Sequence, residues 1–228
     1  MGKTSTLLLA IAALLFLSAC SRDPASSITS ASGPIQVSAD ANGNPGLTLH
    51  PNGFGRDTYS AWKAGEGETD LRGNARMALY FQKFAPITEF VAAVARIQGL
   101  EGRPLSAIQS LSWEHRDDTW CGAGAPRWNI IVADENGNRG VIFLGCAAAV
   151  HSPGHEAGWT KDTQPGAAGI AAAPVFPFGP DFNEGGPFTI SDLQIVFDEG
   201  APFPGFVYLD NIEVNGKVWT SPADNGRN

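Results

Sequence analysis

The sequence predicts an all-β domain, an antiparallel β-sandwich with long Pro/Gly-rich loops. The 228 residues include 27 glycines and 16 prolines, and only 17% of them are charged. Such a chain is short of helix formers and rich in turn formers. Short apolar runs also alternate with clusters of Gly, Pro, Asn and Asp along the chain. These observations favour short strands joined by turns.

The start of the chain is expected to be a targeting segment rather than part of the fold. Lys3 supplies a positive charge, and Leu7 to Leu17 is an unbroken apolar run. This run suits a signal-peptide core, whereas a membrane-spanning helix needs about 20 apolar residues. It ends in Leu-Ser-Ala-Cys, which resembles the lipobox of bacterial lipoproteins. The resemblance implies that residues 1–19 are cleaved off and that the thiol of Cys20 carries lipid such as palmitate.

The mature chain is expected to have three parts. Residues 20–33 comprise the lipidated cysteine and a small, polar stretch that suits a flexible tether. Residues 34–221 form the β-sandwich domain, and residues 222–228 form a tail. The lipid bilayer is therefore an expected partner. The expected location is the bacterial cell envelope, outside the cytoplasm, and the outer membrane if one is present because Ser21 rather than an acid follows the cysteine.

The apolar runs of the domain are predicted to be strands, and their spacing suits antiparallel sheets. The runs are residues 77–84, 105–116, 127–133, 140–146, 189–197 and 206–219. Residues 89–100 leave helix and strand open, because apolar residues at helical spacing are followed by Gly99 without a cap. We favour a strand there. Residues 147–188 are predicted to be one long Pro/Gly-rich loop.

A similar eight-residue pattern occurs twice, as ADANGNPG at 39–46 and ADENGNRG at 133–140. Its Asp and Asn residues could bind calcium, but Gly145 stands where an EF-hand places its closing glutamate. Asn136-Gly137 lies between two apolar runs and is a strong hairpin signal. We therefore interpret the pattern as one turn used twice rather than as a domain duplication.

Cys121 and Cys146 are expected to form a disulfide. They are the cysteines that remain once Cys20 is lipidated, and the expected compartment is oxidising. Two buried thiols are the alternative, and the absence of any Cys-x-x-Cys spacing argues against a zinc pair. With a two-residue Asn-Gly loop, Arg127 lies opposite Cys146 in the hairpin. Cys121 then belongs to a loop that folds back over the hairpin base, where Arg127 is expected to have a structural role.

Asp210 is a candidate for a buried carboxylate. Strand alternation in FVYLDNIEV places it on one face with Tyr208, Ile212 and Val214, which we predict to be the core face. A buried carboxylate needs hydrogen bonds, an ion pair or a metal ion. We favour a structural role and keep a structural calcium ion as an alternative, for which Asp198 could supply further oxygens. Otherwise Asp198 is expected in a solvated turn.

Catalytic signatures are sparse. His151 and His155 have the spacing H-x3-H, but the intervening Ser-Pro-Gly disfavours a helix, so a solvated loop is favoured over a zinc site. His115 is expected to be a half-buried strand residue. The chain has no Gly-x-Ser-x-Gly and no HExxH motif, and the spacing of its carboxylates selects no glycosidase pair.

The remaining signals are charge and tryptophan. The net charge of −8 argues against binding to nucleic acid. Six tryptophans are present, and Trp62, Trp120 and Trp159 lie in or beside predicted loops. A loop tryptophan can stack on the apolar face of a sugar ring, although a role at the edge of the core is the alternative for at least half of the six.

Several segments resemble a set of uncharacterised bacterial exported domains. The segments are GLEGRPLSAIQSLSWEHR, CGAGAPRWNI, FLGC, LQIVFDEG and LDNIEVNGKVW. More loosely, the Leu-Asp-Asn-Ile-x-Val ending is similar to the last strand of jelly-roll carbohydrate-binding modules. That resemblance implies a jelly-roll sandwich in which Asp210 supports the fold or a structural calcium ion. No other cofactor is expected.

The expected function is non-catalytic binding of a glycan or an envelope polymer, with Trp62, Trp120 and Trp159 as candidate contacts. A hydrolase that uses loop carboxylates is the first alternative. A purely structural envelope lipoprotein is the second.

Overall fold

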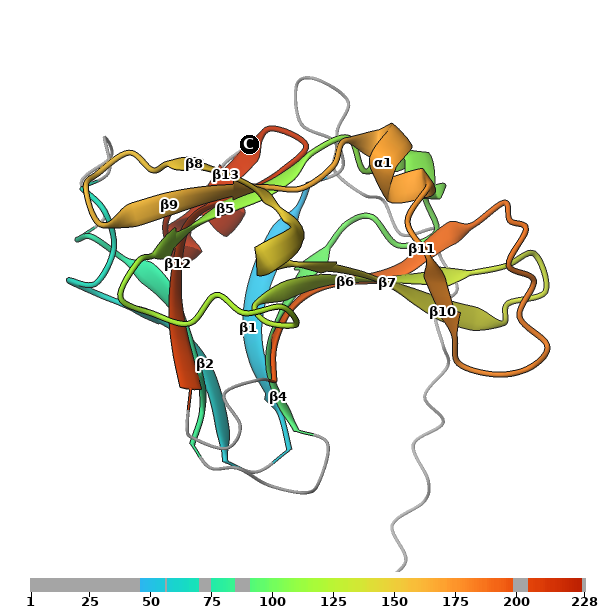
Figure 1. Cartoon of the computed structure of the whole chain (residues 1–228), viewed down its shortest axis with the longest axis horizontal. Coiled ribbons are helices and arrows are strands. Elements are labelled where there is room, and N and C mark those ends of the chain that lie inside the picture. Colours follow the sequence, from blue (N-terminus) through green and yellow to red (C-terminus); the bar gives the residue numbers. More distant parts are fainter. Residues whose placement is uncertain (1–45, 56, 70–74, 85–90, 199–204, 227–228) are drawn as a thin grey trace, which may run out of the picture. The chain divides into compact units, whose positions relative to one another are not determined.

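The computed structural model describes residues 46–55, 57–69, 75–84, 91–198 and 205–226. These residues form two antiparallel sheets, and the predicted β-sandwich of jelly-roll type is confirmed (Figure 1). The leader, Cys20, the tether and nearly all of residues 39–46 lie outside the described residues, so their predicted roles stay predictions. Within the described ranges, no helix has the length and apolar character needed to cross a membrane.

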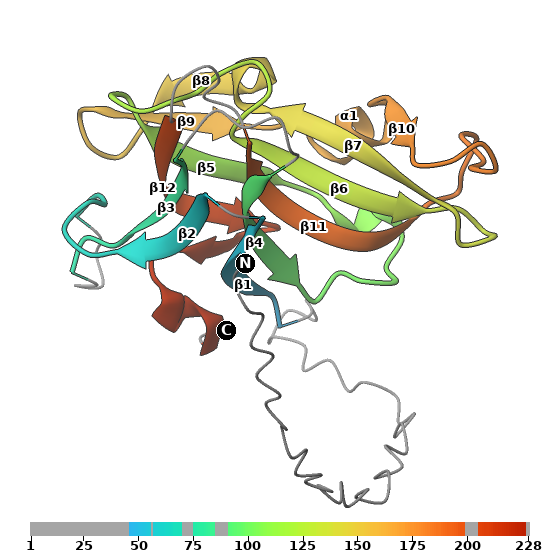
Figure 2. The ribbon, with the colours of Figure 1, turned by 90° about the horizontal axis from the view of Figure 1, so that it is seen from below.

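The first sheet has six strands in the order β1-β4-β11-β6-β7-β10. Its strands are β1 (Thr48–Phe54), β4 (Ala92–Gln98), β6 (Arg127–Ala133), β7 (Arg139–Gly145), β10 (Val175–Pro177) and β11 (Thr189–Phe197). Neighbouring strands all run antiparallel. Figure 2 shows β7, β6 and β11 side by side in this sheet.

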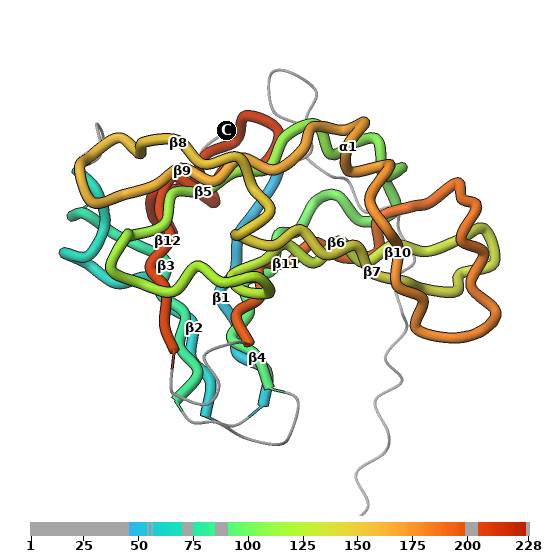
Figure 3. Tube along the Cα trace, in the orientation of Figure 1, coloured from blue at the N-terminus to red at the C-terminus, as the bar shows by residue number. Residues whose placement is uncertain are grey.

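The second sheet has seven strands, six of them in the order β2-β3-β12-β5-β9-β8, with β13 paired to β12. Its strands are β2 (Thr58–Lys63), β3 (Ala78–Lys83), β5 (Leu111–Arg116), β8 (Val150–Pro153), β9 (Trp159–Thr163), β12 (Gly205–Val214) and β13 (Lys217–Trp219). The helical elements are η1 (Leu105–Ala107), η2 (Cys146–Ala148), α1 (Ala167–Ala171) and η3 (Pro222–Gly226). The tube in Figure 3 shows the chain leaving β9, passing through α1 and entering β10 of the other sheet.

The main core lies between the sheets and follows the two-residue period of the strands. In β6, Trp128, Ile130 and Val132 are buried, and the residues between them are more exposed. Trp128 stacks on Trp113 of β5 with ring centroids 5.0 Å apart, so the two sheets are in direct contact at this point. The intervening positions of β6 are left to form an outward face.

Most predicted strands are confirmed, and the ambiguous residues 89–100 contain β4. Residues 105–116 are strand only in their second half, because η1 precedes β5. The prediction of one long loop over residues 147–188 is wrong, since this segment contains β8, β9, α1 and β10. β9 has the sequence WTKDT, in which Trp159 is the single large apolar residue, so the alternation that identifies a strand is missing.

The hairpin of β6 and β7 is confirmed, but its loop is one residue longer than predicted. Arg127 pairs with Gly145 and not with Cys146. The carboxylate of Asp134 accepts the backbone N–H of Asn138 at 2.9 Å, and the N–H of Asp134 donates to the Asn138 carbonyl. These bonds close a three-residue loop, a common alternative to the two-residue turn that Asn-Gly suggested.

The residues assigned to a tail begin with η3, which is bound to the edge strand β1. The side chain of Asn225 accepts the N–H of Leu49 at 2.7 Å and donates to its carbonyl at 2.9 Å. The carboxylate of Asp224 accepts the backbone N–H groups of Thr220 and Ser221. This end of the domain is therefore held by side-chain hydrogen bonds.

Candidate functional site

A groove of about 410 Å³ lies on the outward face of the six-stranded sheet. Residues of β1, β4, β6, β7 and β11 line it, together with Phe178, which follows β10. Strand alternation explains this position, because the residues between the buried ones gather on this face. In Figure 1, β1 and β4 run steeply down the view while β6 and β7 run across it, so the sheet that carries the groove is strongly twisted.

Two exposed aromatic rings line the groove. Phe143 of β7 is 41% exposed, and Phe178 is 59% exposed. The ring of Phe143 contacts that of Phe176 on the neighbouring strand, with centroids 5.3 Å apart, and the guanidinium of Arg127 lies 5.1 Å from the Phe143 centroid. The Phe143 ring is therefore held by its neighbours while part of its surface stays open to solvent.

Arg127 forms a bidentate ion pair with Asp198 at this groove. The Nη1–Oδ1 and Nη2–Oδ2 distances are both 2.6 Å, and Nε of Arg127 donates to the Asn129 side chain at 2.9 Å. Both side chains are mostly buried. Asp198 is therefore bound to an arginine, and the expectation of a solvated turn at this residue is wrong.

The second charged group in the lining is also paired. Arg96 of β4 lies 2.9 Å from the carboxylate of Asp192, and the amide of Gln194 donates to the same oxygen at 2.7 Å. Among the described residues, the lining contains neither Asp nor Glu. The groove thus combines aromatic rings, side-chain amides and guanidinium groups whose charges are balanced by nearby carboxylates.

The structure places the three predicted tryptophan contacts away from this groove. Trp62 packs against the main core, and Trp159 is buried in a small cluster with Tyr80 and Tyr208 on the outer face of the seven-stranded sheet. Trp120 is exposed, and its backbone N–H donates to the backbone carbonyl of Phe206 in β12. Of the three, only Trp120 offers a large open ring surface.

The sequence does not single out the groove aromatics, because a tryptophan in a predicted loop is the more direct signal for a sugar contact. One sequence signal was available. In the strand GVIFLGC, Phe143 alternates with Ile142 and Leu144, which face the core, so period two puts its ring on the outer face. Phe178 has no such signal, because it lies in the segment that was predicted as loop.

Asp210 is buried as predicted, but on the opposite face of its strand. Val207 and Leu209 face the main core before it, and Ile212 and Val214 face the same core after it. This is possible because the pairing of β12 with β5 shifts register between residues 210 and 213. The bulge reverses the alternation, so Asp210 lies on the outer face of the seven-stranded sheet rather than in the main core.

On that outer face, Asp210 belongs to a cluster of buried carboxylates with Glu68 and Glu114. Asp210 is the cross-strand partner of Glu114, and its Oδ2 accepts the backbone N–H of Glu68 at 2.8 Å. Gly67 permits this approach, because a Cβ there would lie 2.7 Å from the same oxygen. The side chain of Glu68 accepts the N–H of Glu156 at 2.7 Å. The cluster therefore ties two surface segments to the sheet.

The carboxylates of this cluster do not titrate independently. Burial and a hydrogen bond with Glu114 raise the pKa of Glu68 from 4.5 to about 8. Burial acts to raise the pKa of Glu114 as well, but hydrogen bonds from Glu68 and His155 outweigh it, so the Glu114 pKa is lowered. Near neutral pH, Glu68 is thus the protonated partner and Glu114 the ionised one.

This cluster is the part of the described chain that best suits a hard cation. Ligand atoms of Glu68, Glu114 and His155 lie within 4.8 Å of one another, and the Asp210 carboxylate is adjacent. Carboxylate oxygens are the donors that calcium prefers. Asp198 is bound to Arg127 in the groove and is not a member of this cluster.

His151 and His155 do not converge on one site. Nδ1 of His151 lies 2.7 Å from Asp162, the cross-strand partner of Trp113, whose side chain faces the core. Nδ1 of His155 lies 2.6 Å from Glu114, which is on the outer face of the sheet. The predicted solvated loop is wrong for His151, which belongs to β8. Their H-x3-H spacing therefore does not place the two imidazoles on a common face.

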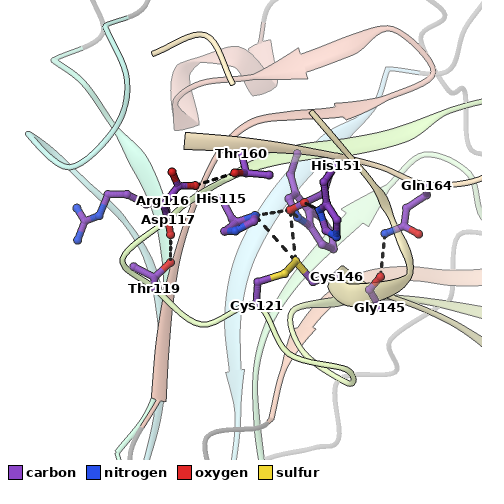
Figure 4. Close-up of a disulfide and its surroundings, with 12 residues drawn as sticks. His115, Arg116, Asp117, Thr119, Cys121, Gly145, Cys146, His151, Thr160 and Gln164 are labelled. Atoms are coloured by element: carbon purple, nitrogen blue, oxygen red, sulfur yellow. Dashed lines mark hydrogen bonds and ion pairs between the residues drawn. A yellow bond between two sulfur atoms is a disulfide. The ribbon is translucent and has the colours of Figure 1, made fainter. Parts of the chain in front are cut away.

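The predicted disulfide between Cys121 and Cys146 is confirmed, with Cα atoms 5.6 Å apart. The loop after Cys121 folds back as expected: Gly122 N–H donates to the Ala125 carbonyl at 2.7 Å, and Cys146 N–H donates to the Pro126 carbonyl at 2.9 Å. Figure 4 shows this disulfide with His115 beside it.

Comparison with known proteins gives distant structural similarity. No protein-family model matches the chain, and no curated protein sequence matches it. A family 11 carbohydrate-binding module of a cellulosomal cellulase of Clostridium thermocellum is 14% identical, with 78% of this chain and 92% of that chain covered and a TM-score of 0.43. The same organism's family 11 module in complex with a beta-1,3-1,4-mixed-linked tetrasaccharide gives 13% identity, the same coverages and a TM-score of 0.42.

A third similar structure is an exo-beta-agarase, with 10% identity and a TM-score of 0.31, covering 83% of this chain and 25% of that chain. Similarities at this level assign no ligand and no residue roles.

Proposed function

We propose that the groove on the six-stranded sheet binds an uncharged glycan strand without catalysis. The observation that carries this proposal is the lining itself, in which the exposed rings of Phe143 and Phe178 lie together with the amides of Asn129 and Gln194. A sugar ring has an apolar C–H face and a polar edge, so it needs both kinds of surface at once.

The electrostatics of the groove support an uncharged ligand. Arg96 and Arg127 are the charged residues of the lining, and each is paired with an aspartate. An anionic ligand would have to compete with these carboxylates, whereas a hydroxyl can hydrogen-bond to a paired guanidinium or an amide without separating charges. The volume of about 410 Å³ is also within the usual range of about 300–1,000 Å³ for small-molecule sites.

The hydrolase alternative has less support within the described residues. A glycosidase needs two carboxyl groups that flank the bond to be cleaved. Glu68 and Glu114 are almost fully buried, are hydrogen-bonded to each other and lie at the outer face of the other sheet, away from the groove. The groove lining described above contributes no carboxylate of its own.

The proposed setting is the cell envelope, with the domain anchored outside the cytoplasm through a lipid on Cys20. Support comes from the apolar leader and the Leu-Ser-Ala-Cys sequence. Cell fractionation and mass spectrometry of the wild-type chain and a Cys20→Ala variant test this setting. We expect a lipid adduct and membrane association for the wild type alone.

A structural calcium ion held by Glu68, Glu114 and Asp210 is a further part of the proposal. The ligand atoms of Glu68 and Glu114 lie within 4.8 Å of each other and the Asp210 carboxylate is adjacent, so their oxygens would offer calcium the kind of donors it prefers. The ion would join the outer face of the sheet to the segment that contains Gly67.

The test of the groove is a screen of residues 34–228 against soluble polysaccharides by affinity electrophoresis, followed by calorimetry on any hit. Phe143→Ala is expected to weaken binding about tenfold, since an aromatic contact of about 1.5 kcal/mol is lost. Phe206→Ala is the matched control, because Phe206 is similarly exposed but lies on the other sheet.

Each other outcome has a defined meaning. Loss of binding in Trp120→Ala with normal binding in Phe143→Ala would move the site to the β12 side and overturn the groove. Release of reducing sugar ends would establish the hydrolase, and absence of binding to every polymer would leave the structural role.

A further inference from the structure

Four side chains able to bind a metal meet at the disulfide. They are His115, Cys121, Cys146 and Asp162, and one ligand atom from each lies within 4.8 Å of the others. Nδ1 of His115 is 2.6 Å from Oδ2 of Asp162, and Sγ of Cys146 is 3.4 Å from the same oxygen. Figure 4 shows His115 beside the two bonded cysteines.

The positions of these four residues do not depend on the disulfide alone. His115 and Asp162 belong to the paired strands β5 and β9, so the seven-stranded sheet sets their separation. Cys146 is held through its N–H by the Pro126 carbonyl, and Gly122 closes the turn that follows Cys121. The ligand set is therefore expected to stay together when the sulfur–sulfur bond is opened.

We propose that the cluster becomes a zinc site when the disulfide is reduced. A dithiol reductant transfers two electrons and two protons, which breaks the bond between Cys121 and Cys146, forms two thiols and leaves the reductant as a disulfide. Zn²⁺ then binds both sulfurs as thiolates and releases two protons to solvent. Neutral His115 binds through Nδ1 with its proton on Nε2, and the Asp162 carboxylate completes the four ligands.

This ligand set suits zinc better than a hard cation. Zinc prefers four tetrahedral ligands drawn from thiolate, imidazole and carboxylate, with Zn–S bonds of about 2.3 Å. Two such bonds place the sulfurs about 3.8 Å apart in a tetrahedron. The Cα atoms of Cys121 and Cys146 are 5.6 Å apart, so rotation of the side chains can provide this separation.

Groups outside the ligand set already orient the carboxylate. Asp162 is fully buried, and its Oδ2 accepts the indole N–H of Trp113 at 2.7 Å. Its other oxygen lies 2.7 Å from Nδ1 of His151, whose side chain is 45% exposed. Partners of this kind fix the orientation of metal ligands in other sites.

The experiment compares oxidised and reduced full-length protein. The protein is reduced with a phosphine, freed of it by anaerobic gel filtration, checked for two thiols and titrated with Zn²⁺ against a chromophoric chelator. Reduction is expected to tighten zinc binding by at least about a thousandfold. Co²⁺ in place of zinc is expected to show thiolate charge-transfer bands and the visible bands of a tetrahedral site.

Variants separate this site from non-specific thiol binding. His151→Gln removes an outer partner of Asp162 and is expected to weaken zinc binding about tenfold to a hundredfold, with tetrahedral cobalt bands retained. His115→Gln removes a ligand and is expected to alter those bands. His50→Gln is the matched control, because His50 bonds to Thr48 on the other sheet, and it should leave affinity unchanged.

Two results would overturn the proposal. One is a reduced protein with native circular dichroism that binds zinc no more tightly than the oxidised protein. The other is a reduced protein that has lost its native spectrum and does not regain it when zinc is added.

Discussion

Glu68→Gln should change how the stability of the domain depends on pH. The pKa of Glu68 is raised from 4.5 to about 8 by burial and by the hydrogen bond with Glu114. Between these values the folded protein binds one proton more than the unfolded chain. The contribution of Glu68 to the unfolding free energy is therefore fully present below about pH 4.5 and is lost as the pH rises through 8.

The size of the effect follows from the single extra proton. One proton corresponds to about 1.4 kcal/mol per pH unit, so the unfolding free energy of the wild type should fall by up to about 4 kcal/mol between pH 5 and pH 8. Glutamine keeps the shape of the protonated side chain but cannot ionise. We expect the Glu68→Gln variant to lose most of this slope.

Urea unfolding at pH 5, 6, 7 and 8, in the presence of a chelator, measures this slope. Glu135→Gln is the control, because Glu135 is an exposed residue at the tip of the hairpin of β6 and β7. Parallel slopes for the wild type and Glu68→Gln would refute the shared proton. If Glu135→Gln reduces the slope as much as Glu68→Gln does, the slope reflects the overall charge of the protein rather than the proton on Glu68.

Three further predictions concern the disulfide, the groove ion pair and calcium. Replacing Cys121 and Cys146 together by alanine should lower the unfolding free energy by about 3 kcal/mol, because the disulfide closes a separation of 25 residues; chemical denaturation measures this, and an unchanged midpoint would contradict it. Asp198→Asn leaves the guanidinium of Arg127 without its anion and should lower the unfolding free energy by about 3 kcal/mol in the same assay. A decrease below about 0.5 kcal/mol, which is typical of ordinary surface substitutions, would show that the ion pair does not stabilise the fold. Calcium at about 100 times its dissociation constant should stabilise the wild type by about 2.7 kcal/mol and stabilise Asp210→Asn far less, which thermal melts with and without chelator can test; equal responses would remove Asp210 from the ligand set.

The sequence allowed the sandwich to be predicted where local signals agree with tertiary structure. In β6, alternating apolar residues lead into the Asn-Gly turn, and the prediction for residues 127–133 matches the strand bounds. The disulfide was predicted because two cysteines remain once Cys20 is lipidated and the expected compartment is oxidising. Neither the alternation in β6 nor the cysteine count depends on how the sheets pack.

The errors come from features that depend on distant residues. The face of Asp210 could not be predicted, because the bulge after it is defined by pairing with β5, about a hundred residues earlier. Glu68 lies in the connection that follows β2, which has no apolar pattern, yet it is buried because Asp210 and Glu156 bind it. The groove was missed because its lining comes from five strands, each of which contributes only two or three residues.

The hydrogen bonds between Asn225 and β1 also affect the tendency of the protein to associate with other copies of itself. β1 is an edge strand, and an edge strand offers unpaired N–H and carbonyl groups to a strand of another molecule. The Asn225 amide bonds to both groups of Leu49, as a neighbouring strand would. The last helical turn therefore acts as a cap against edge-to-edge association. A chain cut before Asn225 should keep its fold but form intermolecular β-sheet more readily.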